Sequence, residues 1–297
     1  MEKKRWIALL GAGVISAGLL AGCCSSTGTG TQPSGESKGT VTIGYVNWSE
    51  GIAMTNLVSA VLQDKLGYQV ETTMTDVAPL FASLSSGGTD VFLDAWLPVT
   101  HESYMNQYGD DLEDLGINYE NAKIGLVVPS YLGIDSIEGL NGIKDALDGT
   151  IVGIDAGAGI MSSTTVAIEA YGLEYELMPG SGPTMTAALK KAIDAEEPIV
   201  VTGWTPHWMF ARWDLKFLED PQNVYGAAEY IHTVARKGFS ADHPEVSAFL
   251  SRFSMTSKQL GDLMGVLEND ASGKDTLDLM RDWISQNEEL VDGWLKA

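Results

Sequence analysis

Short apolar runs alternate with stretches of helical periodicity along most of the chain. Residues 41–46 form an apolar run, and residues 56–66 then place Leu57, Val58 and Val61 on one helical face. Further strands are expected at residues 70–74, 91–96, 123–128, 151–154 and 199–204, and further helices at 79–84, 160–171 and 185–193. After residue 231 the alternation stops, and three helices are expected to begin near Pro244, Ser257 and Asp275. This order predicts an α/β fold with mainly parallel sheets.

The two halves of the chain repeat one pattern, an apolar run that leads to Trp-x-Pro. Residues 90–101 read DVFLDAWLPVTH and residues 197–208 read EPIVVTGWTPHW, so that Trp96 and Trp204 are 108 positions apart. Ligands of open α/β sheets bind at the carboxyl ends of strands, so two such halves would face each other with both Trp residues in a cleft. The alternative is that each Trp fills the core of its own half, as large aromatic residues commonly do.

The repeat and the helical tail together predict the domain organisation. We expect one lobe to comprise residues 40–125 plus 233–297 and the second lobe to comprise residues 126–232. The chain would cross between the lobes near residues 123–129 and 230–236. Each lobe then has the size of an ordinary domain with its own hydrophobic core.

The N-terminus carries an export signal. Residues 3–5 are basic, and the apolar stretch at residues 6–20 is too short for a membrane span. It ends in Leu-Ala-Gly-Cys, which resembles the lipobox of bacterial lipoproteins. This predicts a signal peptide at residues 1–22, lipidation of Cys23, a flexible tether at residues 23–39, and anchoring to the outer face of the bacterial cytoplasmic membrane. The alternative is an ordinary secretory signal in which the cysteine is incidental.

Composition and motifs exclude several classes of function. The formal net charge of −22 disfavours nucleic acid and anionic lipid as partners. The sequence contains neither a Gly-x-Ser-x-Gly elbow nor a His-Glu-x-x-His motif, and its four histidines are scattered. The glycine pair Gly157 and Gly159 lacks the third glycine of a dinucleotide fingerprint, because Ser162 takes that place. We therefore expect a binding protein, with no catalytic residues, metal or cofactor.

A glycine-rich turn provides a candidate anion site. Residues 153–161 read GIDAGAGIM, a pattern of strand, turn and helix start. Free N–H groups of Gly159 and Ile160 at a helix N-terminus would bind an anion. The alternative is that the glycines only make a tight strand-to-helix connection. The equivalent turn of the first half carries Trp48 instead.

Three Trp residues that converge on one cleft would form a cage for a cation. A quaternary ammonium has no N–H to lose from water, and π faces attract it by about 2 kcal/mol or more per desolvated contact. A primary ammonium would lose hydrogen bonds that indole faces do not replace. An anion site beside such a cage would suit a carboxylate, and a small molecule with both groups is a betaine.

The segments VNWSE, DAWLPVTH, GAGIM, GWTPHWMF and IHTVARKGF resemble the substrate-binding lipoproteins of glycine betaine ABC importers of the OpuA/ProU type. The resemblance implies a two-lobed periplasmic-binding-protein fold (type II, Venus-flytrap) that closes over its ligand in the cleft between the lobes. It also implies an ABC permease and its ATPase subunit as partners. The implied ligand contacts are Trp48, Trp96 and Trp204 around the trimethylammonium group, and His101 with the amides of Gly159 and Ile160 around the carboxylate.

A choline- or carnitine-preferring protein of the same type is the alternative. A choline binder would gain from an acid near the cage, and Glu50 and Asp94 are the candidates, although a loop acid such as Glu50 is equally expected in solvent. His101 would face solvent if it only began a helix. His207 and Trp208 are expected to support the loop of Trp204.

Overall fold

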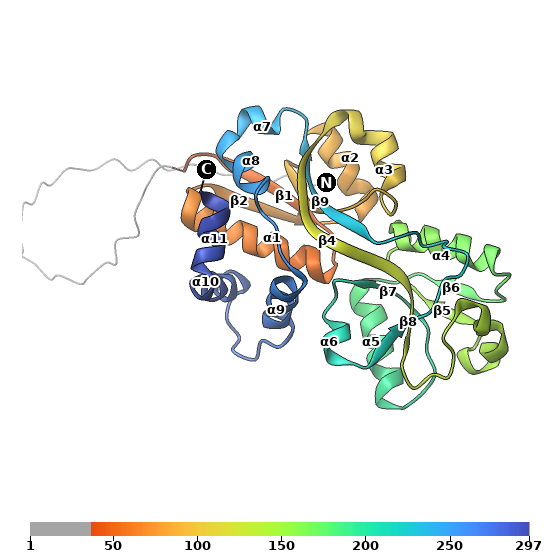
Figure 1. The fold of residues 1–297 in the computed structure, drawn as a ribbon. Coiled ribbons are helices and arrows are strands. Elements are labelled where there is room, and N and C mark those ends of the chain that lie inside the picture. The colour runs from red at the N-terminus through yellow and green to blue at the C-terminus, as the bar shows by residue number, and fades with distance from the viewer. Residues whose placement is uncertain (1–36, 297) are drawn as a thin grey trace, which may run out of the picture. The chain divides into compact units, whose positions relative to one another are not determined.

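The computed structural model describes residues 37–296 and consists of two α/β lobes joined by a shared long strand (Figure 1). The expected two-lobed fold is confirmed. The signal peptide, Cys23 and the tether as far as residue 36 lie outside the described residues. Among residues 37–296, no helix is long and apolar enough to cross a membrane.

The first lobe is built on a sheet with the strand order β2-β1-β3-β9-β4. Its strands are β1 (Thr40–Tyr45), β2 (Gln69–Met74), β3 (Val91–Leu97), β9 (Glu229–Arg236) and the first part of β4 (Leu112–Pro129). Its helices are α1 (Ser49–Val61), continued by a π-helix (Leu62–Leu66), α2 (Val77–Ser86) and α3 (Glu102–Tyr108), with a 3-10 turn at Gly109–Asp111. Sequence periodicity placed β1, β2 and β3 within one residue, but it did not predict β9 or the first part of β4, and α1 begins seven residues before the predicted start.

The second lobe uses the later part of β4. Its other strands are β5 (Thr150–Val152), β6 (Glu176–Met178), β7 (Val201–Thr205) and β8 (Leu215–Phe217). Its helices are α4 (Gly159–Ala170), α5 (Gly182–Asp194) and α6 (Met209–Arg212), with 3-10 turns over Ile137–Leu147. Ser181 and Thr184 form a capping box at the start of α5, which fixes where that helix begins.

β4 connects the lobes because its two parts have different partners. Its residues 112–122 pair with β9, and its residues 123–127 pair with β7. Figure 1 shows the strand passing from one sheet into the other. The pairings of β4 with β7, β8 and β9, and of β3 with β9, are antiparallel. The expectation of mainly parallel sheets is therefore wrong, because β4 and β9 lie between the parallel β1, β2 and β3 of one lobe and the parallel β5, β6 and β7 of the other.

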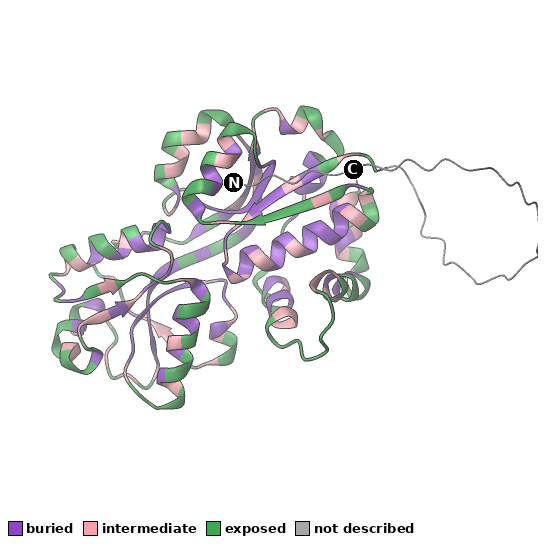
Figure 2. Ribbon diagram, turned by 180° about the vertical axis from the view of Figure 1, so that it is seen from behind, coloured by how far each residue is buried: buried purple, intermediate pink, exposed green. Residues whose placement is uncertain are grey.

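The C-terminal part of the described chain is helical, and two of its helices cover α1 of the first lobe. The helices of this part are α7 (Phe239–Asp242), α8 (Pro244–Leu250), α9 (Ser257–Glu268), α10 (Thr276–Gln286) and α11 (Glu288–Leu295). The three predicted helix starts are confirmed within one residue. The last predicted helix is in fact two helices, because Asn287 leaves the helical conformation with φ −129° and ψ 31°. Since α9 and α10 pack on α1, most of α1 is buried, as Figure 2 shows.

Candidate functional site

Three Trp residues lie at the ends of strands and face one cavity between the lobes. Trp48 is the N-cap of α1 and follows β1, Trp96 lies in β3, and Trp204 lies in β7. Each is at most 5% exposed. The cavity is narrow, with a volume of about 20 Å³, and its lining consists of Trp48, Glu50, Trp96, Thr100, His101, Ile124, Ile154, Ala158, Gly159, Ile160 and Trp204. The structure thus brings together all six residues that the resemblance implied.

The lobes approach each other closely around this cavity. A Cβ atom on Gly159 of the second lobe would lie 2.1 Å from the backbone oxygen of Thr100 in the first lobe. Hydrogen bonds also cross the cleft beside this cavity: Trp48 Nε1 donates to Asp155 Oδ2 (3.0 Å), Trp204 Nε1 to Glu50 Oε2 (2.9 Å), and Tyr104 Oη to the Gly157 carbonyl (2.8 Å). The structure is therefore that of a closed cleft, and at residue 159 only glycine fits it.

His101 is a buried, neutral hydrogen-bond donor. The Trp96 backbone N–H donates to His101 Nδ1 at 2.9 Å, which places the remaining ring proton on Nε2. Burial lowers the pKa of His101 to about 3, so the imidazole carries no charge near neutral pH. Nε2 has no partner among residues 37–296, and the ring stacks on Trp48 at 5.8 Å. The ring therefore presents an unused N–H donor at the cavity, and the solvent-facing alternative is wrong.

The N-terminus of α4 provides a second set of donors. Gly159 and Ile160 are its first residues, and the N-cap residue Ala158 makes no side-chain capping bond. The first N–H groups of a helix have no partner within the helix, and the helix dipole adds positive potential there. Because Ala158, Gly159 and Ile160 all line the cavity, this helix end can serve an anion inside it.

Every cage Trp gives its indole N–H to a carboxylate. Trp48 uses Asp155, Trp204 uses Glu50, and Trp96 donates to Asp94 Oδ1 at 2.8 Å. Glu50 and Asp94 are 0% and 1% exposed, so the expectation that Glu50 is a solvated loop acid is wrong. Burial raises the pKa of Glu50 to about 8, and burial together with the charge of Glu50 raises the pKa of Asp94. Sequence reasoning missed Asp155, for which the only signal was its place in the glycine-rich segment.

His207 packs behind Trp204 and joins the two lobes. Its ring meets the indole edge-on at 4.7 Å, and its Nε2 lies 3.2 Å from Ser49 Oγ of the first lobe. The Met209 backbone N–H donates to its Nδ1, and burial lowers its pKa to about 3. These contacts agree with a supporting role for His207 in the loop after Trp204.

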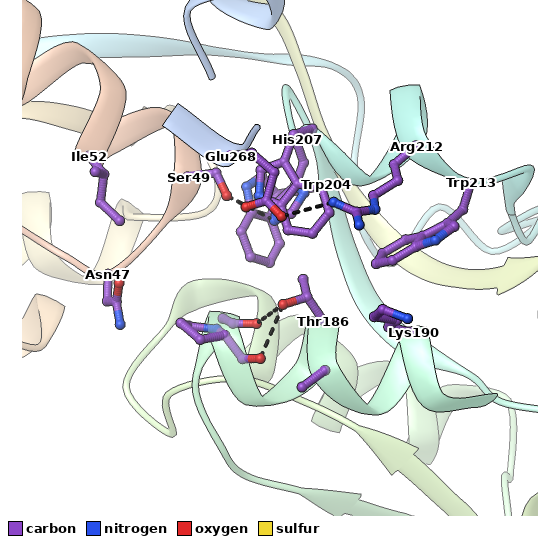
Figure 3. Close-up of a pocket in the computed structure, with 14 residues that line it drawn as sticks. Asn47, Ser49, Ile52, Thr186, Lys190, Trp204, His207, Arg212, Trp213 and Glu268 are labelled. Atoms are coloured by element: carbon purple, nitrogen blue, oxygen red, sulfur yellow. Dashed lines mark hydrogen bonds and ion pairs between the residues drawn. The ribbon is translucent and has the colours of Figure 1, made fainter. Parts of the chain in front are cut away.

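An open groove lies on the other side of Trp204 and contains a cross-lobe ion pair (Figure 3). Arg212 of α6 lies 3.2 Å from Glu268 of α9, and its guanidinium lies over the rings of Trp208 and Trp213. Both members of the pair are partly exposed. Both the groove and the cavity have aromatic rings in their lining, but the groove also has the basic side chains of Lys190 and Arg212, whereas no lysine or arginine lines the cavity. In the described part of the chain, no cluster of three His, Cys, Asp or Glu side chains could hold a metal ion.

Comparisons with known proteins agree with this geometry. The family described as the substrate binding domain of ABC-type glycine betaine transport systems matches residues 39–286. The glycine betaine/carnitine transport binding protein GbuC of Listeria monocytogenes is 47% identical over 156 residues, which are 51% of this chain and 51% of that protein. The match thus spans about half the length of that relative.

Two solved structures resemble the whole described chain. Lactococcal OpuAC, in a closed conformation complexed with glycine betaine, is 36% identical with a TM-score of 0.81, covering 87% of this chain and all of that one. An ABC-transporter choline binding protein in complex with choline is 28% identical with a TM-score of 0.79, covering 86% of this chain and 91% of that one.

Proposed function

Since the chain belongs to the family of substrate-binding domains of ABC-type glycine betaine transport systems, we propose that it captures glycine betaine or a related quaternary ammonium compound outside the cytoplasm. It would deliver this ligand to an ABC permease driven by an ATPase subunit. The observation that carries the proposal is one cavity in the closed cleft that combines three indole rings with unused N–H donors.

The trimethylammonium group would lie among Trp48, Trp96 and Trp204. Because all three indole N–H groups are already bonded to carboxylates, the rings offer the cavity their π faces and apolar edges rather than hydrogen bonds. A quaternary ammonium needs no hydrogen bond and gains from such faces. A primary ammonium would lose its bonds to water there, so methylated ammonium compounds are the ligand class that this surface selects.

The carboxylate would accept hydrogen bonds from His101 and from the start of α4. His101 Nε2 is an unpartnered neutral donor, and the uncapped N–H groups of Gly159 and Ile160 add a local positive potential. Donors of this kind bind a carboxylate more strongly than a neutral hydroxyl. This arrangement favours a betaine over choline.

A choline- or carnitine-preferring protein is the second candidate. The solved choline complex supports it through overall similarity, and the buried acid Glu50 lines the cavity. Against it, one oxygen of Glu50 is already engaged by Trp204 and one oxygen of Asp94 by Trp96. We therefore assign both acids to the rear of the cage.

Anchoring and lobe boundaries complete the proposal. The Leu-Ala-Gly-Cys sequence supports lipidation of Cys23 and attachment to the outer face of the cytoplasmic membrane. The change of partners along β4, from β9 up to residue 122 to β7 from residue 123, supports lobes close to residues 40–125 plus 233–297 and residues 126–232, with all of β9 from residue 229 in the sheet of the first lobe. A globular body on a flexible tether would stay close to its membrane partner.

Intrinsic fluorescence of the protein from residue 24 onward tests the proposal. Glycine betaine that enters a cage of three indoles should change the emission in a saturable way, whereas glycine, which has a primary ammonium, should not. Carnitine, proline betaine and choline in the same titration rank the alternatives. An emission spectrum that stays unchanged at millimolar concentrations of every quaternary ammonium compound would refute the proposed function.

A further inference from the structure

Two buried carboxyl groups lie side by side behind the cage. Glu50 is in the first turn of α1 and Asp94 is in β3, directly beneath that turn. Their proximity follows from Gly51, where a Cβ atom would lie 2.5 Å from Asp94 Oδ2. In each group one oxygen accepts an indole N–H, and the other oxygen, Glu50 Oε1 or Asp94 Oδ2, has no partner among the described residues.

Two adjacent carboxylates without partners are unstable when both are ionised and buried. Each charge loses its hydration, and the two charges repel each other. Neither group forms an ion pair in the part of the chain that the structure describes. The Trp204 and Trp96 N–H groups offset only part of this cost, since each bonds a single oxygen.

The charged groups around the pair do not supply a compensating cation. His101 and His207 are buried and neutral. Asp155 adds a further acid at Trp48. The cations on the helices packed against α1 are all exposed: Lys65, Lys258, which is paired to Asp262, and Arg281, which is paired to Asp64 and Asp278. Asp282 on α10 is a further exposed acid, paired to Lys274. On the wall of the groove beyond Trp204 lie Lys190 and Arg212, and Arg212 is paired to Glu268.

We infer that Glu50 and Asp94 hold one proton between them while the cage is empty and release it when a quaternary ammonium enters. This inference rests on the proposed function, because the ligand itself supplies the missing positive charge. The proton is held between the unpartnered oxygens and leaves to solvent, so the pair changes from one negative charge to two. The two acids thus act as positioning residues for the indoles and make the cage select a full positive charge over an uncharged group of the same shape.

Release of a proton on binding makes the affinity for glycine betaine depend on pH. In the closed cleft without ligand, burial raises the pKa of Glu50 to about 8, and the charge of a bound cation lowers this pKa. Below pH about 8 the empty pair holds a proton that the liganded pair has lost, so affinity for glycine betaine rises as pH rises. One released proton corresponds to about tenfold in Kd per pH unit within that window. Above it both states are ionised, and affinity no longer depends on pH.

The test compares glycine betaine with 3,3-dimethylbutanoate, which replaces the quaternary nitrogen by carbon and has no charge on its head. Calorimetric titrations at one pH in two buffers of different ionisation enthalpy count the protons released. We expect about one proton per glycine betaine at pH 7 and none for 3,3-dimethylbutanoate. Glu50→Gln keeps an oxygen for Trp204 but should abolish the release and weaken glycine betaine about tenfold at pH 8, with little effect on 3,3-dimethylbutanoate.

Controls separate this inference from the proposed function and from folding. Glu71→Gln removes one negative charge from an exposed position of β2 and should leave proton release unchanged. Asp94→Asn repeats the test if Glu50→Gln is unstable. Infrared spectra of the ligand-free wild-type protein should show a protonated carboxyl group at pH 7 that disappears on addition of glycine betaine.

The outcomes are distinguishable. Glycine betaine that binds with no proton released and with a flat pH profile overturns the shared proton and leaves the proposed function standing. Absence of any glycine betaine binding overturns the proposed function, and the inference with it.

Discussion

Replacement of Gly159 by alanine should hold the cleft open. The added methyl group would lie 2.1 Å from the Thr100 oxygen and 2.9 Å from the Thr100 carbonyl carbon. Both atoms belong to the backbone of the opposite lobe and cannot move aside as a side chain would. The lobes must therefore separate by about 1 Å or more at this point, since such atoms resist closer contact.

The free-energy cost of closing the cleft over this methyl group can be worked out from the neighbouring contacts. Overpacking costs about 1–3 kcal/mol, and the bond from Tyr104 to the Gly157 carbonyl, 2.8 Å long, would be lost at about 1 kcal/mol more. Together these give about 2–4 kcal/mol, or roughly 30-fold or more in Kd. The ligand-free protein can open to avoid the clash, so the substitution should not lower its thermal unfolding temperature. This temperature should stay the same or rise slightly, because alanine is a better helix former than glycine.

Gly157→Ala is the matched control in the same turn. Its methyl group would find Tyr104 Oη at 3.5 Å and no closer atom, which is an ordinary contact. Fluorescence titration with glycine betaine measures affinity, and small-angle X-ray scattering with ligand measures closure. Wild-type affinity for Gly159→Ala, or an equal loss for Gly157→Ala, would refute the argument from close approach.

Four further predictions concern the cage, the donor, the groove and the fold. Alanine at Trp48, Trp96 or Trp204 should each weaken glycine betaine by about 1–3 kcal/mol in calorimetry, with phenylalanine tolerated better than leucine because it keeps a π face. Equal losses for phenylalanine and leucine would mean that apolar bulk suffices. His101→Ala should weaken glycine betaine more than choline, and equal effects would argue against a carboxylate contact. Glu268→Gln breaks a partly exposed cross-lobe pair, so scattering of the ligand-free protein should change little and the affinity by about 1 kcal/mol at most. Burial alone would raise the pKa of Asp90, but hydrogen bonds from Thr42 and Arg236 have the larger effect, and the net pKa is lowered. The ionised carboxylate therefore stabilises the fold near neutral pH, and this stabilisation is lost as the pH falls and Asp90 is protonated. Asp90→Asn should therefore reduce the unfolding free energy at pH 7 by about 1–3 kcal/mol and less at pH 3, as measured by urea denaturation.

The sequence predicted the positions of the site because they depend on strand ends. Trp96 and Trp204 each follow a buried apolar run, and the repeat between the halves places both at the same edge of similar sheets. Gly159 follows a strand and precedes a helix, which is also a local pattern. Patterns of this kind depend on neighbouring residues in the sequence and not on distant contacts. For this reason the residues predicted from them do line the cavity.

The parts that sequence reasoning missed depend on distant contacts. Glu50 looked like a loop acid, since nothing near it in sequence shows that Trp204, 154 positions away, would cover it. The early start of α1 was hidden because Ser49, Glu50 and Gly51 are not apolar, and Gly51 is required there by Asp94 rather than by the helix. The break at Asn287 interrupts an apolar stripe that continues across it, so periodicity alone predicted one helix.

The most direct measurement is a pair of calorimetric titrations of the protein from residue 24 onward, one with glycine betaine and one with choline. The two ligands share the trimethylammonium group, but glycine betaine has a carboxylate where choline has a hydroxyl group. The unpartnered donor of His101 and the uncapped start of α4 predict at least about tenfold tighter binding of glycine betaine, or about 1.4 kcal/mol. Choline that binds as tightly as glycine betaine would contradict the assignment of that end of the cavity to a carboxylate.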